Sequence, residues 1–267
     1  MVALSNNLGS YMQRRSTFFS LVFNSLLISF STLSYSEQIS VGLEPFPPLV
    51  NEDGSGMVVD MLTTLSTGKN LAFDFRVMTY ARAKKDLAHN NLNLIGLTPY
   101  QLETDEFYQF AAELNWHINT HVDFYALDQD FFNVDALHDG SIGTPIGNAE
   151  FFAEIIDVPV EKFVEVSNLE QLVKMLERGR LKVILFERVS TMSTIKALNI
   201  DKIYYKKMGT VPASLAVANT TKGLKLKNKL DKILANVENE TFFNGFIHYD
   251  STNVPDGVIN SERLKKE

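Results

Sequence analysis

Short apolar runs and amphipathic segments alternate along most of this chain. Mostly apolar runs at 39–43, 92–97 and 183–186 have the length and composition of buried strands. Between such runs, at 57–65 and 169–176, apolar residues recur every three or four positions, as on one face of a helix. Strands that alternate with helices in this way favour an α/β fold with largely parallel sheets.

These elements fall into two groups. The first group, within residues 39–97, predicts the order strand, helix, strand, helix, strand. The second group, within residues 141–187, begins and ends with a strand. Inside it, Ser167 and Glu170 have the spacing of a capping box, which predicts that Ser167 caps a helix.

Two extended segments, 121–127 and 212–218, cross between the groups and predict a hinge. We therefore predict two lobes joined by two hinge crossings. The helices near the end of the chain are expected to pack on the first lobe. The predicted division is lobe I at 37–122 and 213–260, lobe II at 123–212, and a frayed tail at 261–267.

The start of the chain has the layout of a secretory signal peptide. Arginines at 14–15 precede an apolar run at 18–30, and the small residues Ser34 and Ser36 follow. We predict that residues 1–36 are removed after Ser36. The apolar run is shorter than the roughly 20 residues that a membrane span requires, so a permanent anchor is the alternative.

The chain contains no cysteine. This excludes disulfides, thiolate chemistry and the lipid-acceptor cysteine of a bacterial lipoprotein. An exported protein without a tether is most useful where it cannot diffuse away, so we expect the periplasm of a two-membrane bacterium. Secretion to the medium is the alternative, and the layout leaves open whether synthesis begins at Met1 or Met12.

The charge balance and the motifs exclude several classes of function. The signal segment holds two of the 25 basic residues and none of the 32 acidic ones, which leaves a mature net charge of −9. This argues against nucleic acid and anionic membranes as partners. His117 and His121 would lie about 13 Å apart in an extended segment, too far to share a metal. We find no dinucleotide fingerprint and no catalytic triad, and expect neither a cofactor nor enzymatic activity.

A rigid corner at residues 44–48, Glu-Pro-Phe-Pro-Pro, follows the first strand. Prolines fix their own backbone angle and cannot donate to a sheet, so the chain leaves the strand abruptly and holds Phe46 in one place. A rigid aromatic residue at a strand end is suited to bind a ligand. The alternative is that Phe46 is a core residue.

Several short motifs occur in an order and at spacings that resemble one family, the family 3 extracellular solute-binding proteins. The motifs are Phe46-Pro47-Pro48, Met57-Val58-Val59-Asp60, Ala81-Arg82-Ala83, Gly96-Leu97-Thr98-Pro99, Gly147-Asn148 and Gly179-Arg180. The family comprises the periplasmic receptors of polar amino-acid ABC importers and their relatives. The resemblance implies a two-lobed Venus flytrap of α/β domains, a monomer that closes on a small molecule for a membrane permease and does not catalyse a reaction.

The resemblance also implies a set of ligand-binding residues. Phe46 stands where the family places an aromatic residue, Thr98 where a hydroxyl contacts the ligand, and Glu187 where an acid holds the ligand's ammonium. Asn148 and Ala149 open a helix whose free N–H groups would suit a carboxylate. The alternative for Glu187 is a solvated acid.

One position departs from the family pattern. Amino-acid receptors usually carry an arginine where this chain has Thr104, so the bidentate clamp for a carboxylate is missing. Arg82 is the nearest substitute, unless it is a surface residue. Without the clamp, we expect an amine with a flat or apolar portion. With Arg82 as clamp, a modified amino acid or organic acid is favoured.

Three functions remain open from the sequence. The first is a receptor that delivers a small molecule to an ABC-type importer. The second is a receptor that reports ligand occupancy to a membrane sensor. The third is a dehydratase or lyase on the same scaffold, for which Arg82, Glu103 and Glu187 are the candidate catalytic residues.

Overall fold

The computed structural model describes residues 36–251 and 257–259. The predicted signal peptide before Ser36 and the tail at 261–267 lie outside the described residues. The described residues from Glu37 onward form one compact unit. No helix in the described part of the chain is long and apolar enough to cross a membrane.

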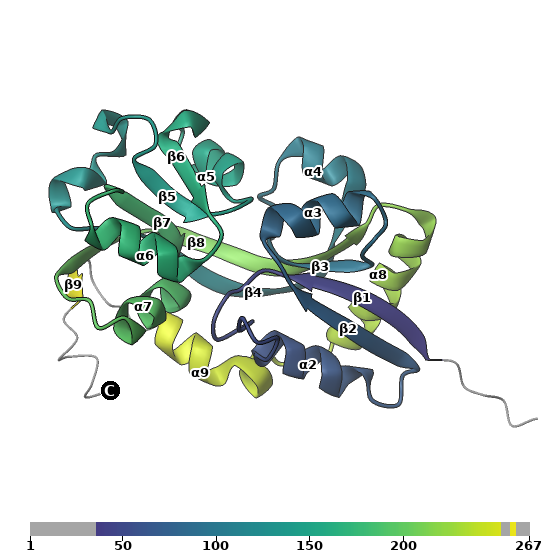
Figure 1. Cartoon of the computed structure of the whole chain (residues 1–267). Coiled ribbons are helices and arrows are strands. Elements are labelled where there is room, and N and C mark those ends of the chain that lie inside the picture. Colours follow the sequence, from purple (N-terminus) through teal and green to yellow (C-terminus); the bar gives the residue numbers. More distant parts are fainter. Residues whose placement is uncertain (1–35, 252–256, 260–267) are drawn as a thin grey trace, which may run out of the picture. The chain divides into compact units, whose positions relative to one another are not determined.

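The first βα group has the predicted element order up to its third strand, and one further helix, which was not predicted, follows (Figure 1). Its elements are β1 (Glu37–Leu43), α2 (Met57–Ser66), β2 (Leu71–Val77), α3 (Tyr80–Ala88), β3 (Leu94–Pro99) and α4 (Asp105–Phe110). Strand β1 pairs in parallel with β2 and with β3. Each helix follows the sequence pattern; in α2, for example, Val58, Met61 and Leu62 are buried while Asp60 is exposed.

The second βα group follows the same plan. Its elements are β5 (Ile142–Pro145), α5 (Ala149–Ile155), β6 (Phe163–Val166), α6 (Leu169–Glu177), β7 (Val183–Glu187) and α7 (Arg188–Ala197), with short 3-10 helices at 129–132, 134–136 and 160–162. Strand β5 pairs in parallel with β6 and β7. The predicted cap of α6 is wrong by one residue: Asn168, not Ser167, accepts the helix N–H, from Gln171 at 2.8 Å.

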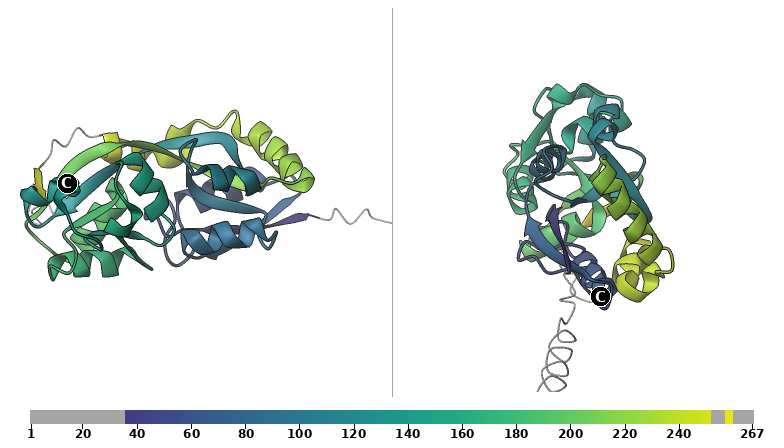
Figure 2. Two further views of the ribbon diagram at one scale, coloured as in Figure 1. Left: turned by 90° about the horizontal axis from the view of Figure 1, so that it is seen from above. Right: turned by 90° about the vertical axis from the view of Figure 1, so that its right-hand side faces the viewer.

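Two sixteen-residue strands, β4 (Ala111–Ala126) and β8 (Ile203–Ala218), join the groups. They pair antiparallel, and Figure 2 shows β8 passing from one group to the other. The strand order in the sheet is β2-β1-β3-β8-β4-β7-β5-β6, and β9 (Gly257–Ile259) pairs with β8. The predicted crossings at 121–127 and 212–218 lie within these longer strands.

The two helices near the end of the chain differ in what they cover. Helix α8 (Thr221–Leu234) packs on β4 and β8, whereas α9 (Asn239–Ser251) contacts α2 of the first group and α7 of the second. Trp116 of β4 fixes the start of α9, because its indole N–H donates to Asn239 Oδ1 at 2.8 Å. The tail helices therefore do not pack on the first group alone.

A buried ion pair ties β4 to the start of α7. Arg188 donates to both carboxylate oxygens of Asp123 at 2.7 Å, and the Tyr125 hydroxyl lies 3.4 Å from the same carboxylate. Both partners of the pair are almost fully buried. Burial, followed by the nearby Asp123 charge, raises the pKa of Tyr125 well above its ordinary value, so the phenol stays protonated.

Removing one partner of this pair should destabilise the fold. Arg188→Met leaves the Asp123 charge buried without its main partner, and we expect the free energy of unfolding to fall by about 3–5 kcal/mol. The double variant Asp123→Leu/Arg188→Met removes both charges and should recover most of that loss. Urea unfolding followed by circular dichroism measures both. A single variant as stable as the wild type would contradict the importance of the pair.

Candidate ligand-binding site

A small cavity lies where the carboxyl ends of β3 and β7 meet the middle of β4 and β8. Ligands of open α/β sheets bind outside the carboxyl ends of strands, so its position is that of a binding site. The cavity volume is about 30 Å³, enough for about two water molecules. Its lining is mostly apolar, and its polar members are Glu44, Thr98, Thr120, Asn148 and Glu187.

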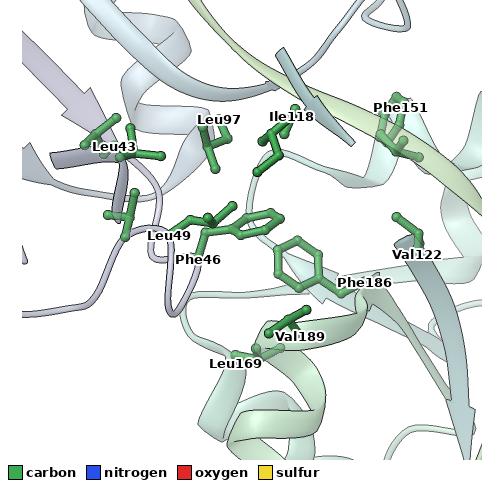
Figure 3. Close-up of a cluster of buried hydrophobic side chains, with 14 of the residues drawn as sticks. Leu43, Phe46, Leu49, Leu97, Ile118, Val122, Phe151, Leu169, Phe186 and Val189 are labelled. Carbon is green, nitrogen blue, oxygen red and sulfur yellow. The ribbon is translucent and has the colours of Figure 1, made fainter. Parts of the chain in front are cut away.

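Two aromatic rings of the cavity lining lie against each other (Figure 3). Phe46 and Phe186 meet edge to face, with ring centroids 5.4 Å apart. The Phe46 corner is closed by two backbone hydrogen bonds to Val50, of 2.7 and 2.9 Å. Phe46 is therefore part of the core and part of the cavity wall. A larger ligand requires the two rings to separate.

Glu44, which follows β1, is a buried acid in this cavity. Its side chain accepts a hydrogen bond from the Asn148 amide at 2.9 Å. Burial raises the pKa of Glu44 from 4.5 to about 8, because the charged form loses its hydration. Asn148 and Lys84 lower this pKa, whereas the charges of Glu165 and Glu103 raise it.

The start of α5 is already occupied by a carboxylate of the protein. Glu165 Oε1 accepts hydrogen bonds from the N–H groups of Gly147 and Ala149, at 2.7 and 3.0 Å. The expectation of a free N–H at Ala149 is therefore wrong. Asn148 is buried, and its side chain is directed to Glu44 and to the Pro145 carbonyl.

Glu187 also has protein partners. It caps α7, with its carboxylate accepting from the N–H groups of Val189 and Ser190 at 2.8 and 2.7 Å. The Ser190 hydroxyl donates to the same carboxylate at 2.5 Å. Glu187 lines the cavity with Phe46, but both of its oxygens are engaged. Its predicted contact with a ligand ammonium stays a prediction.

Thr98, near the carboxyl end of β3, is fully buried and lines the cavity. Its hydroxyl lies beside the Glu113 carboxylate and makes no hydrogen bond of good geometry within the described residues. The hydroxyl helps to lower the pKa of Glu113, which burial raises overall. Thr98 thus lines the cavity, while its hydroxyl interacts with Glu113 of β4.

The structure does not bring Arg82 to the cavity. Its side chain is 72% exposed on α3 and lies 3.5 Å from Asp86, one turn further along the helix. Thr104 caps α4 by accepting the Phe107 N–H at 3.4 Å. Of the six residues predicted from the sequence, Phe46, Thr98, Asn148 and Glu187 line the cavity, and Ala149 lies next to it.

The two βα groups also touch beside the cavity. The Ala81 N–H donates to the Ile146 carbonyl at 3.2 Å, and the Lys84 amine donates to the Gly147 carbonyl at 2.9 Å. Gly147 has φ +104°, and a Cβ there would lie 2.4 Å from the Ala81 nitrogen. Only glycine permits this close approach.

Glu44, Lys84 and Gly147 were not predicted as a set from the sequence. A signal for Glu44 exists, because it follows a strand that runs parallel to the strand ending near Thr98. Lys84 and its partner Gly147 are 63 positions apart in the sequence, and Gly147 and Ala81 are 66 apart. No local pattern encodes contacts between such distant residues.

No protein-family model matches the sequence, and no curated protein matches it either. Solved structures do match. The arginine-bound form of truncated ArgBP from T. maritima is 18% identical, with a TM-score of 0.61 over 77% of this chain and 99% of that one. A histidine-bound ABC transporter substrate-binding protein from Streptococcus pneumoniae is 15% identical, with a TM-score of 0.63 over 85% and 97%.

A third match is the GluR0 ligand-binding core from Nostoc punctiforme in complex with L-glutamate. It is 14% identical, with a TM-score of 0.63 over 80% of this chain and 99% of that one. Identities this low establish the fold alone. The chain has the two-lobed periplasmic-binding-protein fold, and the predicted fold class is confirmed.

A methyl group at Gly147 should disturb the contact between the groups. We expect Gly147→Ala to lower the free energy of unfolding by about 1–3 kcal/mol, because it adds both backbone strain and a clash with Ala81. Gly179→Ala is a matched control, since Gly179 has φ +68° and a Cβ there would meet nothing within 4 Å. Urea unfolding compares the two, and an equal loss in both would argue against the close approach.

The buried Glu44 should make stability depend on pH. The unfolded chain loses this proton near pH 4.5 and the folded protein keeps it to about pH 8, so stability falls as the pH rises between these values. We expect a slope of about 1 kcal/mol per pH unit relative to Glu44→Gln, which cannot ionise. Urea unfolding at pH 5, 6.5 and 8 tests this, with Glu154→Gln as an exposed control. A difference that does not change with pH would contradict the assignment.

Proposed function

We propose that this protein is a solute-binding protein that captures a small amino-acid-like molecule, amine or organic acid for an ABC-type importer. The observation that carries the proposal is the cavity at the junction of the two βα groups. Phe46 and Thr98 come from the first group, Phe186 comes from the second, and Val211 comes from a joining strand. A site assembled from both groups couples ligand binding to their relative position.

In this proposal the ligand enters by hinge motion. The proposed lobes are residues 37–122 with 213–260, and residues 123–212. The register of β4 and β8 shifts between Val122 and Asp123, which is where the proposed lobes meet on β4. Separation of the lobes would break the Phe46–Phe186 contact and open a cavity that is otherwise too small for a metabolite.

The proposed location is the periplasm, reached through the signal peptide at 1–36. The sequence layout of that segment supports export. In this proposal the mature chain works as a monomer beside a membrane permease. The compared structures include a substrate-binding protein of an ABC uptake transporter, which is compatible with such a partner.

A second proposed function is that of a receptor that passes ligand occupancy to a membrane signalling protein. The same cavity and hinge serve both roles, and the GluR0 ligand-binding core shares the fold. Neighbouring permease and ATPase genes would favour delivery, whereas a neighbouring sensor gene alone would favour signalling. Turnover of a bound molecule would favour the dehydratase or lyase alternative.

Binding should stabilise and close the protein. A thermal-shift screen with a metabolite library should reveal a ligand, because a ligand at 100 times its Kd adds about 2.7 kcal/mol to the stability. X-ray scattering with the best hit should then show a smaller radius of gyration. Phe46→Ala, which removes one wall of the cavity, should weaken both effects. A saturating ligand that leaves the radius of gyration unchanged would contradict the hinge.

A further inference from the structure

Two acids, Glu44 and Glu187, line the cavity, and they differ in how many hydrogen bonds their carboxylate oxygens accept. The Glu187 carboxylate accepts three hydrogen bonds from the start of α7. Glu44 accepts one, from the Asn148 amide to Oε1. Within the described residues no hydrogen bond reaches Glu44 Oε2. Glu44 is therefore the acid with acceptor capacity left for a ligand.

Glu44 is buried near three charged side chains and the Tyr80 phenol. The charged side chains near it are Lys84 of α3, Glu103 before α4 and Glu165 of β6. Lys84 is already engaged, because its amine donates to the Gly147 carbonyl at 2.9 Å and lies 3.6 Å from Glu103. An acid in this position is held in its neutral form by burial until a cation arrives.

The cavity offers little to a carboxylate. None of its described lining residues is lysine or arginine. The N–H groups of Gly147 and Ala149, at the start of α5, already bind Glu165. Arg82 is exposed and pairs with Asp86. A ligand carboxylate would therefore be buried near two acids without a charged partner.

We propose that Glu44 is the counter-ion for the ligand, and that the ligand is a primary amine with an apolar or aromatic body and no carboxylate. This inference rests on the proposed solute-binding function. The aromatic rings of Phe46 and Phe186 supply the wall for the apolar body.

The proposal has a measurable consequence for protons. At pH 7 an aliphatic amine is an ammonium ion in solution, while Glu44 carries a proton in the empty cavity. Forming the ammonium–carboxylate pair sends the Glu44 proton to solvent. Close to one proton is thus released for each amine bound, and none is released when a neutral molecule binds.

Isothermal titration calorimetry at pH 7 tests this with 2-phenylethylamine, 3-methylbutylamine, 2-phenylethanol, 3-phenylpropionate and phenylalanine. Repeating each titration in phosphate and in Tris buffer gives the number of protons released. We expect the amines to bind at least tenfold more tightly than the other probes, with release of about one proton. Glu44→Gln, which keeps the shape and the Asn148 hydrogen bond, should weaken amine binding at least tenfold and abolish the release.

Two further variants separate the acids. Glu154→Gln, an exposed change on α5, should leave both quantities unchanged. Glu187→Gln should lower the melting temperature by loss of the α7 cap but keep the proton release. Amine binding that is indifferent to Glu44→Gln, equal binding of the alcohol or the carboxylate, or no binding of either amine overturns the proposal. In each case a hit from the metabolite library still supports the solute-binding function, and absence of any hit counts against both.

Discussion

The pairing of β4 with β8 is the constraint on which the rest of this structure depends. Each strand is sixteen residues long, and the ladder between them joins two sets of parallel strands. The first group attaches through β3 to β8, and the second through β7 to β4. A change in the relation of the two groups therefore bends or twists this pair of strands.

The pairing of β4 with β8 also determines where the cavity lies. Thr120 of β4 pairs with Val211 of β8, and these two residues line the cavity together with Val122 and Ala213. The Thr120 hydroxyl donates to the Val211 carbonyl at 2.7 Å. Contacts between the groups then close the sides, with the glycine turn before α5 set against the start of α3.

The sequence predicted what local patterns encode. Apolar periodicity located the helices and strands, and the prolines around Phe46 indicated a rigid corner that does line the cavity. The partners of the polar groups were not predictable in this way. Whether the Ala149 N–H is free depends on Glu165, sixteen positions later, and the orientation of Arg82 depends on which face of α3 meets the other group. Such contacts depend on tertiary packing, which periodicity does not describe.

The raised pKa of Glu44 follows first from its burial, and the nearest amine, on Lys84, lies against another acid. Glu103 is buried and accepts the Tyr80 hydroxyl at 2.7 Å and the Thr104 N–H at 3.1 Å. Lys84 lies 3.6 Å from Glu103 and over the Tyr80 ring, so that its charge acts on Glu44 only as a secondary effect. A buried carboxylate without a close cation is costly, whereas the same group as a neutral acid with one hydrogen bond is tolerated. Burial therefore raises the pKa of Glu44 to about 8, and Lys84, placed against Glu103, only partly offsets that rise.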